Sequence, residues 1–507
     1  MAATSAQDLP ITAGSPPRSE QGFNLAAMIR IPELVLAVSN YLGRSDIAHL
    51  GCTSRWMFSL CMPLAWESVT GIAQILILLP GTEIQRRCEE DVLIIGEKIT
   101  YVERSRFLVY SSFVKRLEVF PANHGYILKN WENILVYSED HALLPNLVSV
   151  VFDSDMLESY PQYLWTRLVL SPVLQEFQVV VPESKTPVGA PFVVANALTL
   201  ALKERCPQLR RLTLFPSVSL KPHPDEARLI KRHSTSFENL ITRADKLGYL
   251  CTNLNMFGSR SKANCSLPAL THLEIYDVEE RHDCASIARL DLPNLRRFGA
   301  YNLASQAGLE ELWRVIGPAS QHVTHVELEF LARFSRVGSW PYRHDPILTE
   351  AIPFLVAHSP RITDLSVHNL PTIVYEIRRV PALSVAQLLQ KLPLERLRII
   401  GGHIESMVDM ITQGTFARLK KLELPHQCMP VTMLPYFAKY MPNLEYLCLD
   451  LQLETPWEVQ IAGAQASALC ILESSFMVHD PNSYQFSPKL TRDGYATGYS
   501  LAKYVGV

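Results

Sequence analysis

The sequence predicts an α/β fold in which a small module of three helices precedes a long, curved array of strand-and-helix repeats. Two observations carry this prediction. A short apolar motif recurs along most of the chain, and apolar residues follow helical spacing from Ile31 onward. With 507 residues, the chain is long enough for several domains or for one repeat array.

The recurring motif is Pro-x-φ-x-x-φ-x-φ, in which φ is an apolar residue. Six copies are complete, and a seventh fits if Ala300 is accepted as its last apolar residue. Because the chain holds 34 prolines, about one match is expected by chance, so the repeat is real. Four further segments keep the apolar residues without the proline. The eleven segments place their first apolar residue at positions 114, 147, 174, 209, 270, 295, 323, 362, 394, 419 and 444.

Several of these positions lie 25 to 28 residues apart, which is the length of one leucine-rich repeat. In such a repeat, a short strand with alternating buried residues is followed by a helical return. Helical returns are predicted, for example, over residues 193–205 and 383–391, where a proline stops each helix before the next strand. We therefore expect an irregular leucine-rich-repeat horseshoe, which is a solenoid, over residues 112–475.

The rest of the chain carries weaker patterns. The 61-residue gap between the fourth and fifth motif positions holds either a degenerate repeat near Leu250 or an inserted loop, and both alternatives stay open. Residues 69–111 are predicted to be a helical linker. Residues 1–24 are too polar to offset the entropy of ordering and are predicted to be a disordered tail, and residues 476–507 a C-terminal extension.

The helical module begins at Pro32, a residue that suits a helix start, and its first helix is expected to end before Gly43. Ser45 and Asp46 predict the N-cap of a second helix, and a third is expected over residues 54–61. Three helices in about 35 residues are too small to bury a full core. The module is therefore expected to be completed by a partner or by the rest of the chain.

Three stretches of this module carry a family resemblance: IPELVLAVSNYLGRSDIAHL from Ile31, then Ser54-Arg55-Trp56, and finally Pro63-Leu64-Ala65-Trp66. Together they resemble the F-box over residues 31–68. The sequence departs from the usual F-box pattern at Ile31, at Thr53 and at Trp56, which falls one position before the usual aromatic residue. With the irregular repeats that follow, the chain is similar to the large family of fungal, particularly mushroom-type, F-box proteins with leucine-rich-like repeats.

This resemblance implies a substrate-recognition subunit of a Skp/cullin/F-box ubiquitin ligase. The F-box would bind the Skp-type adaptor, and through it a cullin, while the repeats hold an unknown target protein and other subunits transfer ubiquitin. A repeat scaffold outside any ligase, in which the F-box remnant only caps the array, is the alternative. Residues that supply apolar contacts to the adaptor are expected to be Ile31, Pro32, Leu34, Val35, Val38 and Leu42.

Target binding is expected on the strand face that points away from the core. Strand alternation places the third, fifth and seventh motif positions there, and the seventh is repeatedly aromatic. Aromatic residues with Arg and His beside them suit a protein-binding hot spot, although an ordinary solvated strand face is the alternative. The expected target-binding residues, on three successive recognised strands, are Arg211, Phe215, Tyr276, Arg297 and Tyr301.

Composition and motifs argue against several other functions. A net charge of −3 lacks the basic excess that nucleic-acid binding requires, and no apolar run is long enough to cross a membrane. The common phosphate-loop, dinucleotide, metalloprotease and hydrolase motifs are missing, so no enzyme activity, catalytic residue, metal site or cofactor is predicted. Ten cysteines without a C-x-x-C pair, and the lack of a signal-peptide pattern, favour a cytoplasmic or nuclear location.

Overall fold

The structure, a computed structural model, describes most of the chain between residues 31 and 478, and its contacts divide the chain into two units, Met1–Ser68 and Val69–Val507. The predicted tail, 1–24, lies outside the described residues, as does all but residues 476–478 of the predicted C-terminal extension. None of the described helices combines the length and the apolarity that crossing a bilayer requires. The described residues are 31–86, 91–96, 105–119, 126–130, 133–134, 142–153, 167–180, 189–217, 245–257, 265–276, 290–303, 306–331, 346–370, 378–453, 471–473 and 476–478.

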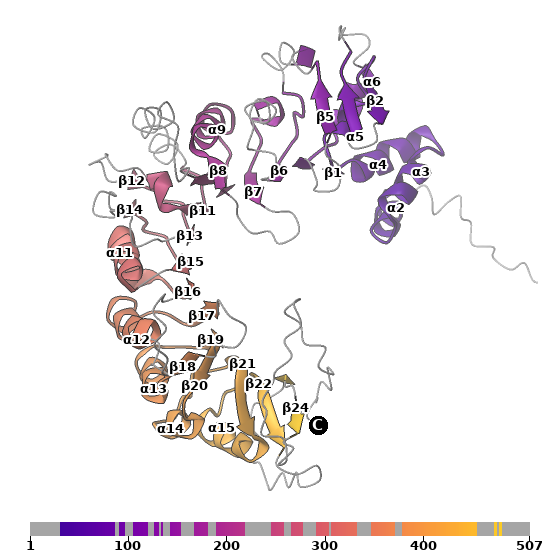
Figure 1. Ribbon diagram of the computed structural model, residues 1–507. Coiled ribbons are helices and arrows are strands. Elements are labelled where there is room, and N and C mark those ends of the chain that lie inside the picture. The colour runs from indigo at the N-terminus through magenta and orange to yellow at the C-terminus, as the bar shows by residue number, and fades with distance from the viewer. Residues whose placement is uncertain are drawn as a thin grey trace, which may run out of the picture. The chain divides into compact units, whose positions relative to one another are not determined.

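The N-terminal unit contains the three predicted helices: α2 (Pro32–Ser39), α3 (Arg44–Gly51) and α4 (Arg55–Ala65) (Figure 1). They enclose a small core. One apolar residue of α2 faces one of α3 and three of α4, and partly buried neighbours such as Leu42 pack around them. The buried core residues are Val35, Ile47, Met57, Cys61 and Ala65.

Two helix ends in this unit differ from the prediction. The residue before α3 is Gly43, in an extended conformation, so Ser45 and Asp46 lie inside the first turn instead of capping it. The third helix does not stop before Pro63 but continues to Ala65. A proline removes only its own N–H from the helix, and the last turn still closes because the Trp66 amide donates to the Met62 carbonyl at 3.0 Å.

The C-terminal unit is built on one large sheet of 15 described strands, and from β4 onward every pair in it is parallel. All eleven motif segments form strands of this sheet in chain order, which confirms the predicted strands. Successive strands are β1 (Ser68–Thr70), β4 (Arg116–Val119), β6 (Ser149–Asp153), β7 (Glu176–Val180), β9 (Arg211–Thr213), β11 (Tyr249–Asn253), β13 (His272–Tyr276), β15 (Arg297–Leu303), β16 (His325–Leu331), β17 (Asp364–Leu370), β19 (Arg396–Ile400), β21 (Lys421–Pro430) and β22 (Tyr446–Leu453), followed by β23 (Ile471–Glu473) and β24 (Phe476–Val478), which both pair with β22. Strand β24 brings the start of the predicted C-terminal extension into the sheet.

The motif does not mark four strands of this sheet: β1, β11, β23 and β24. Strand β11 pairs with both β9 and β13, so the long gap does contain a degenerate repeat near Leu250. Its last apolar position is occupied by Thr252, which is fully buried. The Thr252 hydroxyl donates to the Leu214 carbonyl at 2.8 Å, and this bond lets a polar residue occupy a core position. The expected target-binding residues therefore do not lie on three successive strands, because β11 separates β9 from β13.

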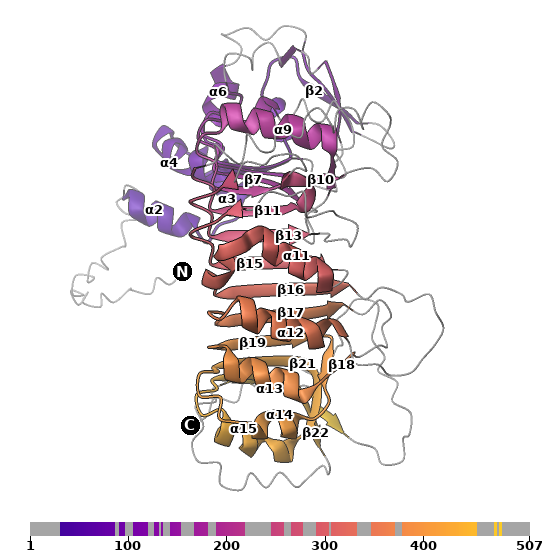
Figure 2. The ribbon, with the colours of Figure 1, turned by 90° about the vertical axis from the view of Figure 1, so that its left-hand side faces the viewer.

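Helices cover one face of the large sheet (Figures 1 and 2). The predicted returns over residues 193–205 and 383–391 are confirmed, since each matches an observed helix to within one residue. The α-helices are α9 (Phe192–Arg205), α11 (Gln306–Ile316), α12 (Pro346–His358), α13 (Ala382–Lys391), α14 (Met407–Thr412) and α15 (Leu434–Tyr440), and the 3₁₀ helices are η2 (Leu254–Phe257), η4 (Gly317–His322) and η5 (Val431–Met433).

The asparagine that follows the motif proline links neighbouring repeats. The side-chain amides of Asn146, Asn294 and Asn443 donate to the backbone carbonyls of Ser112, Pro268 and Ala417, at 2.7, 2.8 and 2.6 Å. Each acceptor precedes its donor by 26 or 34 residues and belongs to the preceding repeat. These bonds satisfy turn carbonyls that the ladder of the sheet leaves open.

The segment over residues 69–111 is not the helical linker that was predicted. It holds the helices α5 (Ala73–Leu76) and α6 (Ser105–Ser111) but also strands β2 (Glu83–Arg86) and β3 (Asp91–Ile94). These strands form a three-stranded sheet with β5 (Tyr126–Lys129). A short apolar run such as Val92–Ile95 fits a buried strand as well as a buried helix, and periodicity does not separate them.

Three small parallel sheets of two strands each complete the described strands of this unit. They are β8 (Gly189–Pro191) with β10 (Phe215–Ser217), β12 (Cys265–Ser266) with β14 (Leu290–Asp291), and β18 (Arg378–Val380) with β20 (Gly402–Ile404).

Candidate functional site

The face of the large sheet opposite the helices, the open face, carries rows of polar and aromatic side chains. The rows arise because the strands are parallel and in register, so equivalent positions of neighbouring strands lie side by side. The row at the amino ends of the strands is the first row, and from β4 to β22 it includes Arg116, Ser149, Glu176, Arg211, Tyr249, His272, Arg297, His325, Asp364, Arg396, Lys421 and Tyr446. The next row, the second row, includes Cys251, Glu274, Gly299, Glu327, Ser366, Arg398 and Glu423.

A shallow cavity of about 440 Å³ crosses this face from β13 to β21. Its wall combines residues of both rows, and it contains two of the expected target-binding residues, Arg297 and Tyr301. The polar residues that line it are His272, Glu274, Arg297, Tyr301, His325, Glu327, Asp364, Ser366, Arg396, Arg398, Lys421 and Glu423.

Aromatic rings pack together near the carboxyl ends of β13 and β15. The rings of Tyr276 and Tyr301 are stacked, with centroids 4.3 Å apart, and the edge of Phe215 meets Tyr276 at 5.1 Å. The structure thus brings three predicted target-binding residues into contact. Phe215, however, does not point outward as predicted: it is only 2% exposed and belongs to the small sheet of β10. The regular alternation stops where β9 ends at Thr213, so Phe215 supports the Tyr276 ring from inside.

Gly299 makes room for the Tyr301 ring. A Cβ atom at Gly299 would lie 2.7 Å from Cε2 of Tyr301 and 3.1 Å from Cγ of Glu274. The Tyr301 hydroxyl is hydrogen-bonded to Glu327, and burial, followed by the charges of Glu274 and Glu327, raises the pKa of Tyr301. Tyr301 is therefore a neutral donor, fixed between carboxylates on either side.

Arg211, another predicted target-binding residue, contacts an aromatic residue on the neighbouring strand of the sheet. Its guanidinium lies over the Tyr249 ring, 4.0 Å from the centroid. The Tyr249 hydroxyl in turn donates to Oε2 of Glu274 at 2.8 Å, and the Cys251 thiol donates to the same oxygen at 3.2 Å. Tyr249 was missed by the sequence analysis because β11 lacks the full motif, although Leu247 and Leu250 keep its first two apolar positions.

On the neighbouring strands β16, β17, β19 and β21, ion pairs dominate the open face. Arg396 is paired with Asp364, with 2.9 Å between Nη2 and Oδ2, and Nε2 of His325 lies 3.0 Å from the same carboxylate. Burial lowers the pKa of His325, and the charge of Asp364 opposes that shift. Arg398 and Lys421 share the carboxylate of Glu423, the former at 2.9 Å. These pairs fix the charged side chains into a defined pattern across neighbouring strands.

In the N-terminal unit, most of the predicted adaptor-binding residues are exposed. Ile31, Pro32 and Leu34 are exposed, and Val38 keeps 52% of its surface in solvent. Leu42 is partly buried against the small core. The prediction for Val35 is wrong: only 6% of it is exposed, because its position on α2 faces the core. Exposed apolar residues that the prediction left out are Leu36, Tyr41 and Trp56.

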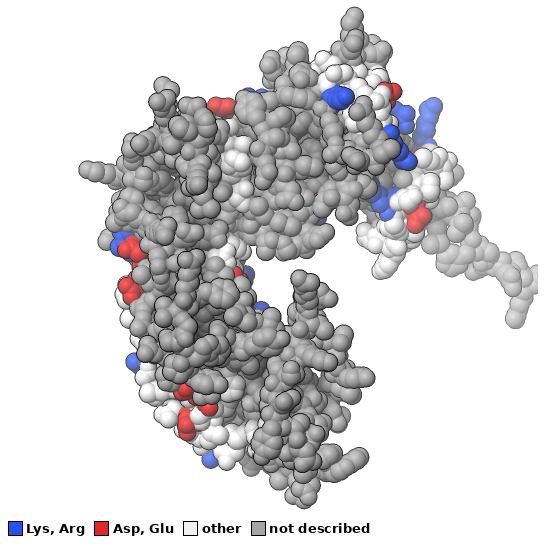
Figure 3. Space-filling model, viewed as in Figure 1, with Lys and Arg blue, Asp and Glu red and all other residues white. Residues whose placement is uncertain are grey.

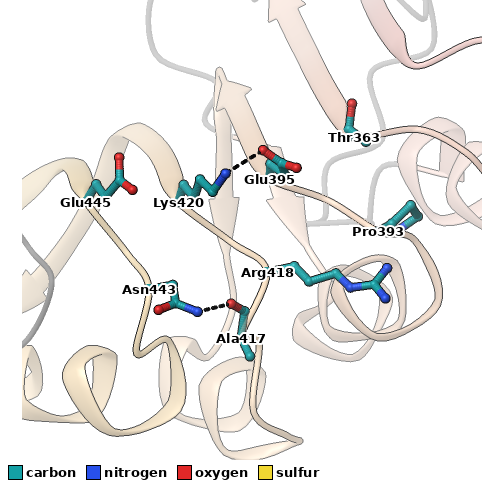
Figure 4. Close-up of a pocket in the computed structure, with 8 residues that line it drawn as sticks. All are labelled: Thr363, Pro393, Glu395, Ala417, Arg418, Lys420, Asn443 and Glu445. Carbon is teal, nitrogen blue, oxygen red and sulfur yellow. Dashed lines mark hydrogen bonds and ion pairs between the residues drawn. The ribbon is translucent and has the colours of Figure 1, made fainter.

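A second pocket of about 410 Å³ lies at the edge of the sheet where β17, β19, β21 and β22 begin (Figure 4). Nζ of Lys420 lies 2.9 Å from Oε2 of Glu395, and Asn443 donates to Ala417 as described above (Figure 4). Both contacts join neighbouring repeats, so the pocket is a product of the stacked turns. Across the described part of the chain, no three His, Cys, Asp or Glu residues are grouped so that they could hold a metal ion.

His272 gives the open face a dependence on pH. Burial, followed by the charges of Arg297, Arg211 and His325, lowers the pKa of His272 from 6.5 to about 4. The unfolded chain therefore binds this proton more readily than the folded one, and the stability from neutral His272 is present above pH 6.5 and lost as pH falls from 6.5 to 4.

His272→Gln removes this contribution, and we expect it to flatten the pH profile of stability. The urea midpoint of the wild type should fall more steeply between pH 7 and pH 4.5 than that of the variant. Parallel profiles for the two proteins would contradict the lowered pKa.

In the view of Figure 3, the visible described Lys, Arg, Asp and Glu residues form small groups of both signs.

The sequence matches none of the protein-family models with which it was compared, and the search of curated proteins finds no similar sequence.

Proposed function

We propose that this protein is the substrate-recognition subunit of a Skp/cullin/F-box ubiquitin ligase. In this proposal the N-terminal unit binds a Skp-type adaptor, the repeats form a leucine-rich-repeat horseshoe, and the open face holds a target protein in the cytoplasm or nucleus. The chain would act by effective concentration, keeping its target near a separately recruited enzyme. It would need no active site of its own.

The observation that carries the proposal is the apolar surface of the N-terminal unit. Its core is small, and large apolar side chains on α2 and on the residues that flank it remain exposed to solvent. An exposed group of this kind marks an interaction site more often than an ordinary solvated surface. The residues concerned are Ile31, Leu34, Leu36, Val38 and Tyr41, with Trp56 on α4.

Val38→Asp is expected to abolish capture of a Skp-type adaptor in a pull-down. A carboxylate at this position would have to be desolvated on binding, which is costly without a partner. The matched control is Val408→Asp on α14, since Val408 is also an exposed helical valine, with 43% of its surface in solvent, but belongs to the C-terminal unit. The control should bind the adaptor like the wild type.

The same pull-down separates the two readings of the sequence. A repeat scaffold outside any ligase would recover no adaptor in the wild type, and equal recovery in wild type and Val38→Asp would mean that α2 is not the docking helix. Either result would count against the ligase proposal.

A further inference from the structure

Arg297 lies in the middle of the open face. It is exposed and lines the 440 Å³ cavity, and its side chain takes part in none of the hydrogen bonds or ion pairs found among the described residues. The other two arginines that line the cavity are paired with carboxylates, Arg396 with Asp364 and Arg398 with Glu423, and Arg211 on β9 lies over the Tyr249 ring. Arg297 is thus available to a ligand.

The second-row carboxylates on the two strands that neighbour β15 are held by other donors. On β13, Glu274 accepts from the Tyr249 hydroxyl and the Cys251 thiol. On β16, Glu327 is hydrogen-bonded to the Tyr301 hydroxyl and lies 3.7 Å from His368. Between them, Gly299 contributes no side chain to the second row of β15. The Arg297 guanidinium therefore lines the cavity without an ion pair to Glu274 or to Glu327.

Two imidazoles flank Arg297 in the first row. His272 is its register partner on β13, and His325 is its register partner on β16. An imidazole offers an N–H donor in its neutral form and two when protonated. The ring nitrogens of His325 are already occupied, Nε2 by Asp364 at 3.0 Å and Nδ1 by the Thr324 hydroxyl at 2.8 Å, whereas the His272 ring makes no hydrogen bond found among the described residues. Arg297 and His272 together are donors that suit an anionic oxygen group, because guanidinium N–H groups bind carboxylate and phosphate in a bidentate manner.

We propose that Arg297 and His272 form an oxyanion-binding site on the open face, which receives a carboxylate or phosphate group of an acidic segment of the target protein. This inference rests on the proposed function only in taking the open face as the target-binding surface. It identifies the chemistry of the target: the docking segment is acidic, and Arg297 is its central contact.

A bound anion would oppose the positive charges that hold His272 in its neutral form. The charged and titratable groups around His272 are Arg211, Tyr249, Glu274, Arg297 and His325, on the neighbouring strands and its own. Because the anion raises the proton affinity of the imidazole, binding takes up protons and becomes tighter as pH falls. We expect stronger binding at pH 6.0 than at pH 7.5.

Fluorescence anisotropy with labelled peptides tests the site on the full chain. The probes are a hexaglutamate peptide, a peptide of alternating phosphoserine and glycine, hexalysine and a short single-stranded oligonucleotide. We expect the acidic peptides to bind, and Arg297→Gln to weaken them at least about tenfold, since a bidentate charged contact is lost. Arg297→Lys keeps the charge and should retain part of the affinity. The stronger of the two acidic peptides identifies the group as carboxylate or phosphate.

The matched control is Arg418→Gln, which removes an exposed arginine at the sheet edge and should leave peptide binding unchanged. His272→Gln should reduce the gain in affinity between pH 7.5 and 6.0. Equal binding by wild type and Arg297→Gln, with equal urea midpoints, would overturn the inference, as would a preference for hexalysine or the oligonucleotide.

Pull-down of the Skp-type adaptor with the same proteins separates this inference from the proposed function. Adaptor binding without acidic-peptide binding would refute the oxyanion site alone. Acidic-peptide binding without adaptor binding would refute the ligase proposal and leave the site in place.

Discussion

Leu447→Ala is expected to lower the free energy of unfolding by about 2–5 kcal/mol, which is the usual cost of emptying a packed core position. Leu447 is 0% exposed on β22, where its backbone is in register with Leu422 on β21 and Leu472 on β23. The cavity left by the alanine would remain open because neighbouring repeats hold the backbone in place. Since each repeat is supported mainly by its neighbours, the array should fail first near this lesion.

Urea unfolding of the full chain measures this loss. The control is Leu383→Ala on α13, where 59% of the leucine side chain is exposed, and its cost should stay below about 1 kcal/mol. A loss below about 1 kcal/mol for Leu447→Ala itself would mean that the position is not in a packed core.

Tyr276→Ala combined with Tyr301→Ala is expected to weaken target capture at least about tenfold, and to leave adaptor binding unchanged. The two rings stack on each other and, with Phe215 at the edge of Tyr276, form a rigid aromatic surface. Aromatic residues of this kind carry interface energy because they present a large area with few free torsions. The adaptor is expected to bind the N-terminal unit, so adaptor capture reports on the N-terminal unit alone.

Proximity labelling compares the targets of wild type and double variant. Tyr436→Ala is the matched control, since Tyr436 is an exposed tyrosine on α15 on the helical side of the sheet. Recovery of an unchanged target set by the double variant would remove the open face from consideration as the target-binding surface.

Gly299→Ala tests the same surface without removing a ring. Its added methyl group would lie 2.7 Å from Cε2 of Tyr301 and displace the ring from Tyr276, so target capture should fall as in Tyr301→Ala. Gly248→Ala is the control, because the nearest atoms to its added Cβ lie at 3.8 and 3.9 Å, an ordinary contact. Equal target capture by Gly299→Ala and Gly248→Ala would contradict a role for the position of the Tyr301 ring.

The sequence by itself determined the strands of the repeat array. Each strand is marked by two buried residues at a spacing of two, which follow an apolar residue and often a proline. When this pattern recurs along the chain, it predicts strands of a stacked repeat. Eleven such segments became eleven strands of one sheet. The pattern did not mark β1, β23 and β24 at the two ends of the sheet. Between β4 and β22 it missed only β11, where a core position is taken by the polar Thr252, whose hydroxyl bonds a carbonyl that lies 38 residues earlier in the chain.

The tertiary structure alone decided which side chains are available for binding. Alternation predicts the face of a residue only while the strand continues, so it placed Phe215 outward although the chain had already left β9. On α2, it was the packing of α3 and α4 that buried Val35 and left Val38 exposed. Among the described residues the Arg297 side chain has no partner, and the carboxylates of Glu274 and Glu327 are bonded instead to Tyr249 and Tyr301. Such contacts join residues far apart in the chain, and the spacing of residues within a single segment does not determine them.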